Sequence, residues 1–314
     1  MIRREFLTRL TGGTVMTGAL RSGDFLRAAT RGPAPQSSDE KLQRIAVSTW
    51  SLHNYFASTR ENEFNLPGKM LDLLDVPQLI ADKYKVHHLE ICVPHFASSE
   101  AAYLRELKNR LTKSGTRVVN MPVDIDEIWN KGGLSDPDKS VRASAVNASK
   151  KWIDVAATIG SAAVRCDPGK LNAKDPAPTV ESYKALAEYG KSKGVHVVIE
   201  NHGGVGSEHP EELVTLFKGV GGDYIGALPD FANFPDETIR ERGLGLLFPY
   251  ARIVCHAKGL EFDAKGNETT YNFPKCIEIS KKAGFKGVYS IEFEGAGDPY
   301  QGVQKVLDEL LREL

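Results

Sequence analysis

Four residues that can bind a metal ion stand at the ends of four short apolar runs in the second half of the chain. They are Glu200, Asp230, His256 and Glu292, which close the runs VHVVIE, YIGALPD, RIVCH and VYSIE. Three carboxylates and one imidazole suit Mn²⁺, Mg²⁺ or Co²⁺ and leave positions open for substrate oxygens. Zn²⁺ is compatible with the set, although structural zinc sites usually carry more Cys or His. The pattern therefore predicts a site for one divalent metal ion.

The same alternation of short strands and helical patterns continues from Leu42 to the end of the chain. The expected strands are short and rich in Val, Ile or aromatic residues, as strands covered by helices should be; they are residues 44–50, 86–93, 116–122, 162–167, 195–200, 224–229, 252–258 and 288–293. The expected helices between them are residues 76–84, 101–112, 141–159, 179–193, 210–217, 237–247, 274–283 and 299–314. Glycines at 115, 194 and 284 stand where helix C-caps are expected.

Eight such units favour an α/β fold, a (β/α)8 TIM barrel formed as a single domain by residues 42–314. The usual size of this barrel is roughly 250 residues, and the carboxyl ends of its strands converge on one site. A doubly wound open sheet would usually carry a Gly-rich phosphate loop after its first strand, and the segment WSLHN at residues 50–54 has none. Any one strand-end acid is equally well explained as a helix cap or an ion-pair partner. Four potential metal ligands at equivalent positions, one at the end of each of four consecutive strands, indicate a shared site.

The N-terminus is typical of an export signal. Arg3 and Arg4 precede Glu5-Phe6-Leu7 in a twin-arginine-like pattern, and residues 10–20 are weakly apolar. We expect a signal segment at 1–30 and a linker at 31–41, which predicts a periplasmic or secreted protein. The alternative is an Arg-rich first helix. No further segment has the length of about 20 apolar residues that crosses a membrane.

Charge and cysteine content narrow the function classes. The net charge is -1, and the first 30 residues hold five Arg against Glu5 and Asp24, a local +3, so the remainder carries -1 - 3 = -4. A mildly acidic body argues against a nucleic-acid partner. The four cysteines show no C-x-x-C spacing, so we expect buried free thiols.

The segments IENHGG, HAKG and YSIEFEG, with the strand-end Asp230, resemble the xylose-isomerase-like barrel superfamily. It includes sugar and sugar phosphate isomerases and epimerases, related hydratases and endonuclease IV, and the resemblance covers essentially everything after Leu42. It implies that Glu200 and Glu292 both bind the metal and transfer protons, while Asp230 and His256 are ligands.

The implied reaction is proton transfer next to a sugar carbonyl. A metal ion that chelates the carbonyl and a neighbouring hydroxyl acidifies the C–H bond between them, and one carboxylate removes that proton to give an enediolate. Return of a proton to the other face gives an epimer, and return to the neighbouring carbon gives an isomer. A metal-dependent lyase or hydratase acting on keto-glycosides or polyol derivatives is the alternative, because the enediolate can expel a β-substituent. A non-catalytic sugar-binding barrel is a second alternative, which the intact pair of glutamates disfavours.

Other polar residues near the strand ends are candidates for substrate binding. They are His202, Lys258, Glu90, Arg165 and Glu294. Each has a structural alternative: a backbone-bonded loop histidine for His202, and ion pairs for Lys258, Glu90 and Arg165. Glu294 is also a rival to Glu292 as last metal ligand, because residues two apart on a strand point to the same side.

Departures from the family pattern bear on the substrate. The ketohexose 3-epimerases carry an acidic residue and a His where this chain has Gly206 and Asn233, which disfavours a free ketohexose. Endonuclease IV needs early-strand histidines, and residues 120–122 are Asn-Met-Pro. We expect a small-molecule carbohydrate, such as an oxidised or oligosaccharide-derived keto sugar, and an assembly compatible with a homo-oligomer.

Overall fold

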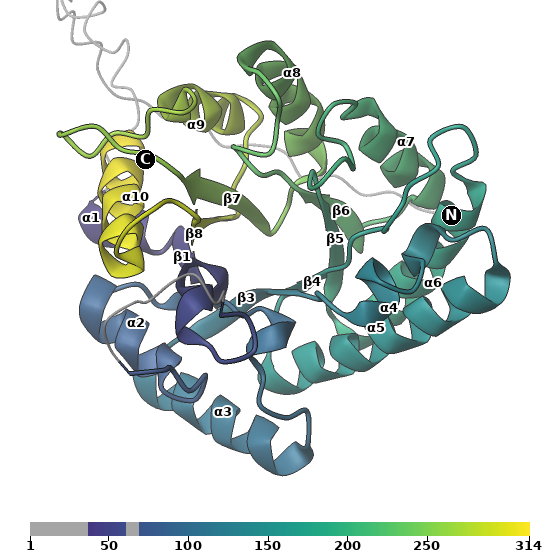
Figure 1. Ribbon diagram of the computed structural model, residues 1–314, viewed down its shortest axis with the longest axis horizontal. Coiled ribbons are helices and arrows are strands. Elements are labelled where there is room, and N and C mark those ends of the chain that lie inside the picture. The colour runs from purple at the N-terminus through teal and green to yellow at the C-terminus, as the bar shows by residue number, and fades with distance from the viewer. Residues whose placement is uncertain (1–36, 61–68) are drawn as a thin grey trace, which may run out of the picture. The chain divides into compact units, whose positions relative to one another are not determined.

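The computed structural model describes residues 37–60 and 69–314, in which parallel strands alternate with helices around a ring (Figure 1). The strands are β1 Ile45–Ser48, β2 His88–Glu90, β3 Arg117–Pro122, β4 Ala163–Arg165, β5 His196–Glu200, β6 Ile225–Leu228, β7 Val254–Gly259 and β8 Val288–Phe293. The helices are α1 Ser38–Leu42, α2 Val76–Tyr84, α3 Ala101–Ser114, α4 Asp126–Trp129, α5 Lys139–Ile159, α6 Ala177–Lys193, α7 Glu211–Val220, α8 Glu237–Leu247, α9 Phe273–Lys282 and α10 Pro299–Glu313.

The sheet closes on itself at the place where the metal-binding residues were expected. The strands pair in parallel in the order β6-β5-β4-β3-β2-β1-β8-β7. The two outer strands meet through a bridge between Asp230 and His256, in which the His256 amide donates to the Pro229 carbonyl at 2.9 Å and the Phe231 amide donates to the His256 carbonyl at 3.2 Å. The fold is therefore the single-domain (β/α)8 TIM barrel that the sequence predicted.

A small apolar cluster fills the barrel beneath the site. It consists of Ala46, Val119, Ala163, Val198, Leu228 and Val254. Three of these residues stand two positions before Glu200, Asp230 and His256. Because strand side chains alternate between faces, an inward apolar residue is followed two positions later by an inward polar one. The strand pattern itself therefore places these three polar groups above an apolar plug.

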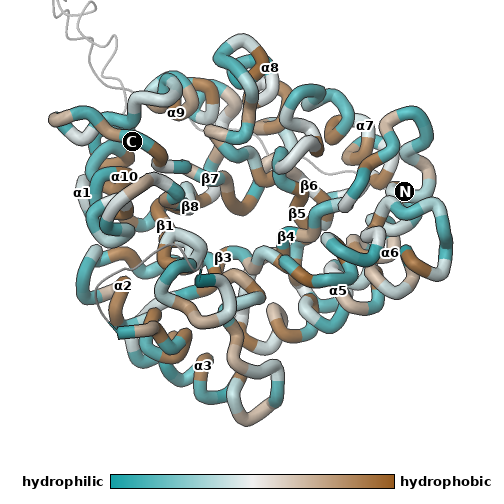
Figure 2. The backbone as a smooth tube through the Cα atoms, in the orientation of Figure 1, coloured by the Kyte–Doolittle hydropathy of each residue, from teal (hydrophilic) through white to brown (hydrophobic). Residues whose placement is uncertain are grey.

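The helices cover the strands with their apolar faces. Along α5 and α10, hydrophobic and hydrophilic residues alternate, and the buried residues recur at helical spacing (Figure 2). Gly115 and Gly194 end α3 and α6 in the left-handed conformation, as expected. Each predicted strand and helix is present, with boundaries that differ by a few residues.

Some structure was not anticipated. Helix α1 occupies the last residues of the segment expected to be linker, and it is stabilised by a capping box between Ser37 and Glu40. Helix α4 lies in the long connection after β3. The expected signal at 1–30 lies outside the described residues. Within residues 37–60 and 69–314, no helix is long and apolar enough to cross a membrane.

Helix α8 offers a test of how closely the barrel is packed beside the site. A Cβ at Gly243 would lie 2.4 Å from Cε1 of the buried Phe234, in the loop that follows β6, whereas a Cβ at Gly245 would meet nothing within 4 Å. Gly245→Ala should stabilise the fold by up to about 1 kcal/mol through helix propensity. Gly243→Ala should destabilise it by roughly 1–3 kcal/mol through overpacking. Urea unfolding of the two variants measures the difference, and equal stability would contradict the close packing of α8 on this loop.

Candidate metal and active site

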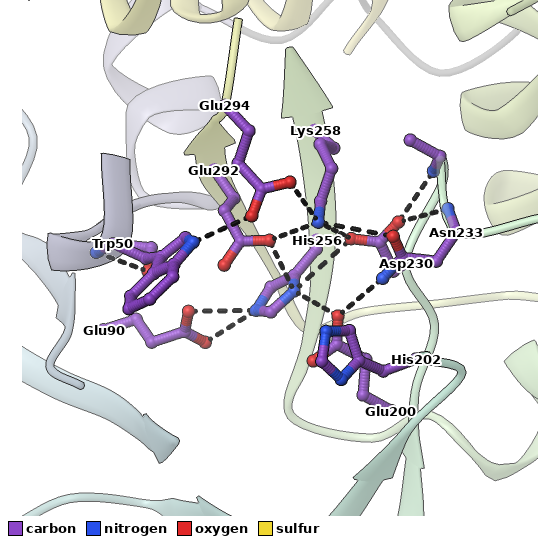
Figure 3. A network of polar contacts seen from close by, with 12 residues as sticks. Trp50, Glu90, Glu200, His202, Asp230, Asn233, His256, Lys258, Glu292 and Glu294 are labelled. Atoms are coloured by element: carbon purple, nitrogen blue, oxygen red, sulfur yellow. Dashed lines mark hydrogen bonds and ion pairs between the residues drawn. The ribbon is translucent and has the colours of Figure 1, made fainter. Parts of the chain in front are cut away.

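The four residues at the ends of β5 to β8 meet at one point above the apolar plug (Figure 3). Glu200, Asp230, His256 and Glu292 are all buried, and one ligand atom from each lies within 4.8 Å of the others. Three carboxylates this close repel one another in a buried place unless a positive charge lies among them. The arrangement therefore calls for a cation.

His256 lies at the middle of this group. Its Nδ1 is 3.1 Å from Glu200 Oε1, 3.4 Å from Glu292 Oε2 and 3.6 Å from Asp230 Oδ2. Burial alone would lower the pKa of His256, but the surrounding carboxylates, Glu292 first, raise it well above its usual value. Without a metal ion the imidazole therefore holds a proton that a bound cation would replace.

Glu90 lies on the other side of the imidazole ring. Its Oε1 is 2.9 Å from His256 Nε2, and its Oε2 accepts a hydrogen bond of 2.9 Å from Asn120 Nδ2. Glu90 is fully buried and is not among the residues that line the cavity, and its expected contact with substrate stays a prediction. A carboxylate bonded to Nε2 fixes the tautomer in which Nδ1 is free to bind a metal.

Asp230 has one oxygen in use and one free of hydrogen bonds. Oδ1 accepts from the amides of Ala232 at 2.7 Å and Asn233 at 2.8 Å. Oδ2 is buried and has no hydrogen-bond partner. Only the longer ion pairs with His256 Nδ1 at 3.6 Å and Lys258 Nζ at 3.5 Å reach this oxygen. A buried carboxylate oxygen that lacks a hydrogen bond is costly unless positive charge lies beside it. The donor set and this oxygen therefore fit a divalent ion held by Glu200, Asp230, His256 and Glu292.

Lys258 and Glu294 stand above the group. Lys258 Nζ is 2.9 Å from Glu292 Oε2 and 3.0 Å from Glu294 Oε2. Burial alone would lower the pKa of Lys258, but Asp230, Glu292 and Glu294 raise it well above its usual value, so the side chain is an ammonium. Glu294 also accepts a hydrogen bond of 2.8 Å from Trp50 Nε1. Glu294 is held at the rim, and Glu292 is the residue within the metal-binding group.

Arg165, the last residue of β4, orients Glu200. Its guanidinium pairs with Glu200, with Asp124 and, at 3.4 Å, with Asp167. Together with His256 it lowers the pKa of Glu200 well below the usual value, although burial alone would raise it. Asn233 Nδ2 donates to the other Glu200 oxygen at 3.1 Å. Glu200 is therefore a fixed carboxylate.

Asp124, an acid of this network, was missed in the sequence, whereas Asp167 falls at the end of the expected strand 162–167. Asp124 lies two residues beyond β3 and Asp167 two beyond β4. Asp167 also contacts His202, whose Nδ1 is 3.5 Å from its Oδ2. Burial alone would lower the pKa of His202, but Asp167 and Glu200 raise it to about 9. The available signal for Asp124 was position, because it follows a strand end as the chosen residues do.

A cavity of about 270 Å³ opens over the group. Its walls come from several strand ends and are formed by Trp50, Cys92, Pro122, Asp124, Trp129, Arg165, Glu200, His202, Lys258, Glu292 and Glu294. The volume is near the lower end of the roughly 300–1,000 Å³ of small-molecule sites. Of the four candidate metal ligands, only Glu200 and Glu292 line it. All four cysteines are free and buried, as expected.

The comparisons with known proteins agree with this geometry. Residues 80–314 match the family model described as xylose isomerase-like TIM barrel. The chain belongs to this family. No curated protein sequence matches it.

Solved structures show the same fold at low identity. A xylose isomerase-like TIM barrel protein from Mycobacterium smegmatis in complex with magnesium has a TM-score of 0.61 and 16% identity, over 89% of this chain and 99% of that one. A D-allulose 3-epimerase from Methylomonas sp. has a TM-score of 0.65 and 13% identity, over 86% and 98%. A 3-keto-D-glucoside 4-epimerase from E. coli, in its apo form, has a TM-score of 0.61 and 13% identity, over 85% and 98%.

The site predicts tight binding of one Mn²⁺ per chain. Calorimetric titration of EDTA-treated protein should give one site, weakened at least 100-fold in Asp230→Asn, because a ligand is lost. The Glu90→Gln variant should bind Mn²⁺ about 10–100-fold more weakly, because Glu90 orients His256 and is not itself a ligand. The exposed Glu188 serves as the control, and Glu188→Gln should bind as wild type.

The same titration should depend on pH. His256 is protonated in the metal-free protein and must be neutral to bind, so metal uptake releases at least one proton. The apparent affinity should rise by about tenfold per pH unit as pH increases. If the Mn²⁺ affinity does not depend on pH, and the Asp230→Asn variant binds Mn²⁺ as tightly as wild type, the metal binds elsewhere.

Proposed function

We propose that this protein is a divalent-metal-dependent isomerase or epimerase of a sugar or keto-sugar derivative. One observation carries the proposal: Glu200 and Glu292 line the cavity, while Asp230 and His256 lie beneath it. Two carboxylates that touch both the metal position and the substrate space have the placement required of a proton-transfer pair. A bound Mn²⁺, Mg²⁺ or Co²⁺ would act as a Lewis acid on a substrate carbonyl.

The two glutamates approach the cavity from different strands. Glu200 ends β5 and Glu292 lies near the end of β8, and His256 lies between their side chains (Figure 3). One carboxylate accepts the proton from the carbon beside the carbonyl, and the other delivers a proton to the opposite face or to the neighbouring carbon. Because the reaction is reversible, each serves as acceptor in one direction and donor in the other. Arg165 and Lys258 hold the two carboxylates in position throughout.

The surroundings of the pair support a carbohydrate substrate. Trp50 and Trp129 both line the cavity and offer faces against which a sugar ring can stack. Lys258, His202 and Glu294 supply groups that bond hydroxyls. The structurally similar proteins include a D-allulose 3-epimerase and a 3-keto-D-glucoside 4-epimerase, which supports a sugar in this cavity.

Two positions favour a sugar derivative over a free ketohexose. Asn233, where the ketohexose 3-epimerases have His, donates to Glu200 instead. Gly206, where they have an acid, has a φ of +66°, and a Cβ there would lie 2.5 Å from Leu213 Cδ1. No side chain fits at residue 206 without rearrangement, so the substrate is recognised by other residues.

A lyase or hydratase is the second candidate, and His202 favours it. The pKa of His202 is raised to about 9 and the residue lines the cavity, so its imidazolium can protonate a departing oxygen. Product analysis separates the two: an epimer or isomer supports the first proposal, and an eliminated fragment supports the second.

Solvent exchange tests the proton transfer. The protein is incubated in D2O with Mn²⁺ and a 3-keto-glucoside, and the sugar is monitored by NMR. The C–H bond beside the carbonyl should be replaced by C–D, and EDTA should stop this exchange. Glu200→Gln and Glu292→Gln should each lower the rate by about 10²–10⁴, because a general acid/base is removed. Calorimetry on the same variants reports whether metal is still bound.

Glu188→Gln, on the exposed side of α6, is the matched control and should exchange at the wild-type rate. The proposal fails if no keto sugar exchanges with any of the three metals. It also fails if both glutamine variants keep the wild-type rate.

We also propose export by the twin-arginine route, which rests on Arg3 and Arg4 ahead of a weakly apolar segment. Residues 1–41 fused to a reporter should direct it to the periplasm, and replacement of both arginines by Lys should retain it in the cytoplasm. A reporter that stays in the cytoplasm in both cases would contradict export.

A further inference from the structure

A second cavity, of about 760 Å³, adjoins the first. Its lining comes from the loops that follow β7 and β8 and from the first turns of α10, on the face where the strands end. Glu294 lines both cavities. The two spaces therefore meet at one side chain, on the same side of the barrel as the candidate metal ligands.

We propose that this second cavity, the β7–β8 groove, is a subsite for the second residue of a glycoside whose keto sugar occupies the first cavity. The inference rests on the proposed function and narrows the substrate class to keto-glycosides of two or more residues. The first cavity alone, about 270 Å³, is small, and the groove offers the room for a further sugar.

The groove has the polar and aromatic groups that a neutral sugar needs. Phe262 is half-buried and supplies an aromatic side chain to the lining, with the Phe293 ring centroid 6.3 Å away and Lys305 Nζ 5.2 Å from its own ring centroid. Gln301 is exposed, and in the described structure its amide makes no hydrogen bond, so it is available to sugar hydroxyls. The charged groups of the lining are three carboxylates, of Glu261, Glu294 and Asp298, and the ammonium of Lys305. A neutral polyhydroxylated group suits such a lining better than an anion does.

Glycines keep the groove open. Gly297 has a φ of +102°, which favours glycine, and so leaves the lining without a side chain there. A Cβ on Gly295 would lie 1.9 Å from the Leu260 carbonyl oxygen, so the β7 and β8 loops touch at a position that tolerates no side chain. The shape of the groove is therefore set by close backbone packing.

Glu294 is suited to contact both sugar residues. Its oxygens are held by Trp50 Nε1 at 2.8 Å and Lys258 Nζ at 3.0 Å, yet 34% of its side chain is exposed. A carboxylate fixed between the two cavities can accept hydrogen bonds from hydroxyls on either side of a glycosidic bond. It thus marks the boundary between the two subsites.

Equilibrium binding of maltose and glucose tests the subsite without requiring turnover. Titrated into the Mn²⁺-loaded full chain and followed by tryptophan fluorescence, maltose should bind at least tenfold more tightly than glucose. Gln301→Trp should fill the groove and reduce the maltose affinity to that of glucose, while the glucose affinity stays unchanged. Lys305→Ala should give a smaller loss for maltose alone.

Asp308→Trp provides the matched control, because it puts the same bulk at an exposed position of α10 outside the groove, and it should leave both affinities unchanged. Maltose binding no tighter than glucose binding would overturn the subsite, as would a Gln301→Trp effect equal for both sugars. This result is independent of the deuterium-exchange experiment. If the protein catalyses exchange but does not prefer maltose, only the subsite proposal is wrong. If it prefers maltose but catalyses no exchange, only the catalytic proposal is wrong.

Discussion

The repulsion among buried carboxylates around His256 is the constraint on which the rest of the site depends. Glu200, Asp230 and Glu292 converge within 4.8 Å of one another and of the imidazole, in a place from which water is largely excluded. At a separation of 4 Å, two like charges oppose each other by about 4 kcal/mol at an effective dielectric constant of 20. Such a group persists only with compensating positive charge. In the metal-free protein a proton on His256 and the ammonium of Lys258 supply it; a divalent ion would do so more completely.

The packing of the barrel holds the carboxylates together against their electrostatic repulsion. The inward residues two positions before Glu200, Asp230 and His256 are locked in the apolar plug, so these side chains cannot move apart without unpacking the barrel. The bridge between Asp230 and His256 closes the sheet at the same level. The positions of the charged groups are thus fixed before any ligand arrives, which is what a preorganised site requires.

The fold and the four central residues could be predicted from the sequence because they depend on short-range periodicity. Two-residue alternation on strands places Glu200 and His256 inward, and glycine C-caps mark where helices such as α3 and α6 end. The role of Glu90 depends on long-range register and could not be predicted this way. The β2–β3 pairing shifts between Leu89 and Glu90, so that Glu90 pairs with Asn120 and points beneath His256.

Asp124 was missed for a related reason. It lies in a connection without regular strand structure, and its contact with Arg165 is fixed only when β3 and β4 pair. The β7–β8 groove likewise arises from loops whose shape depends on tertiary contact between Gly295 and Leu260. Local sequence patterns carry no information on such pairs of distant loops.

Anomalous diffraction from crystals soaked in Mn²⁺ locates the metal ion directly. We predict one strong manganese peak bonded to Glu200, Asp230 Oδ2, His256 Nδ1 and Glu292, with Glu90 still bonded to His256 Nε2. A structure with no peak among these four side chains, or with manganese only at the protein surface, would contradict this prediction.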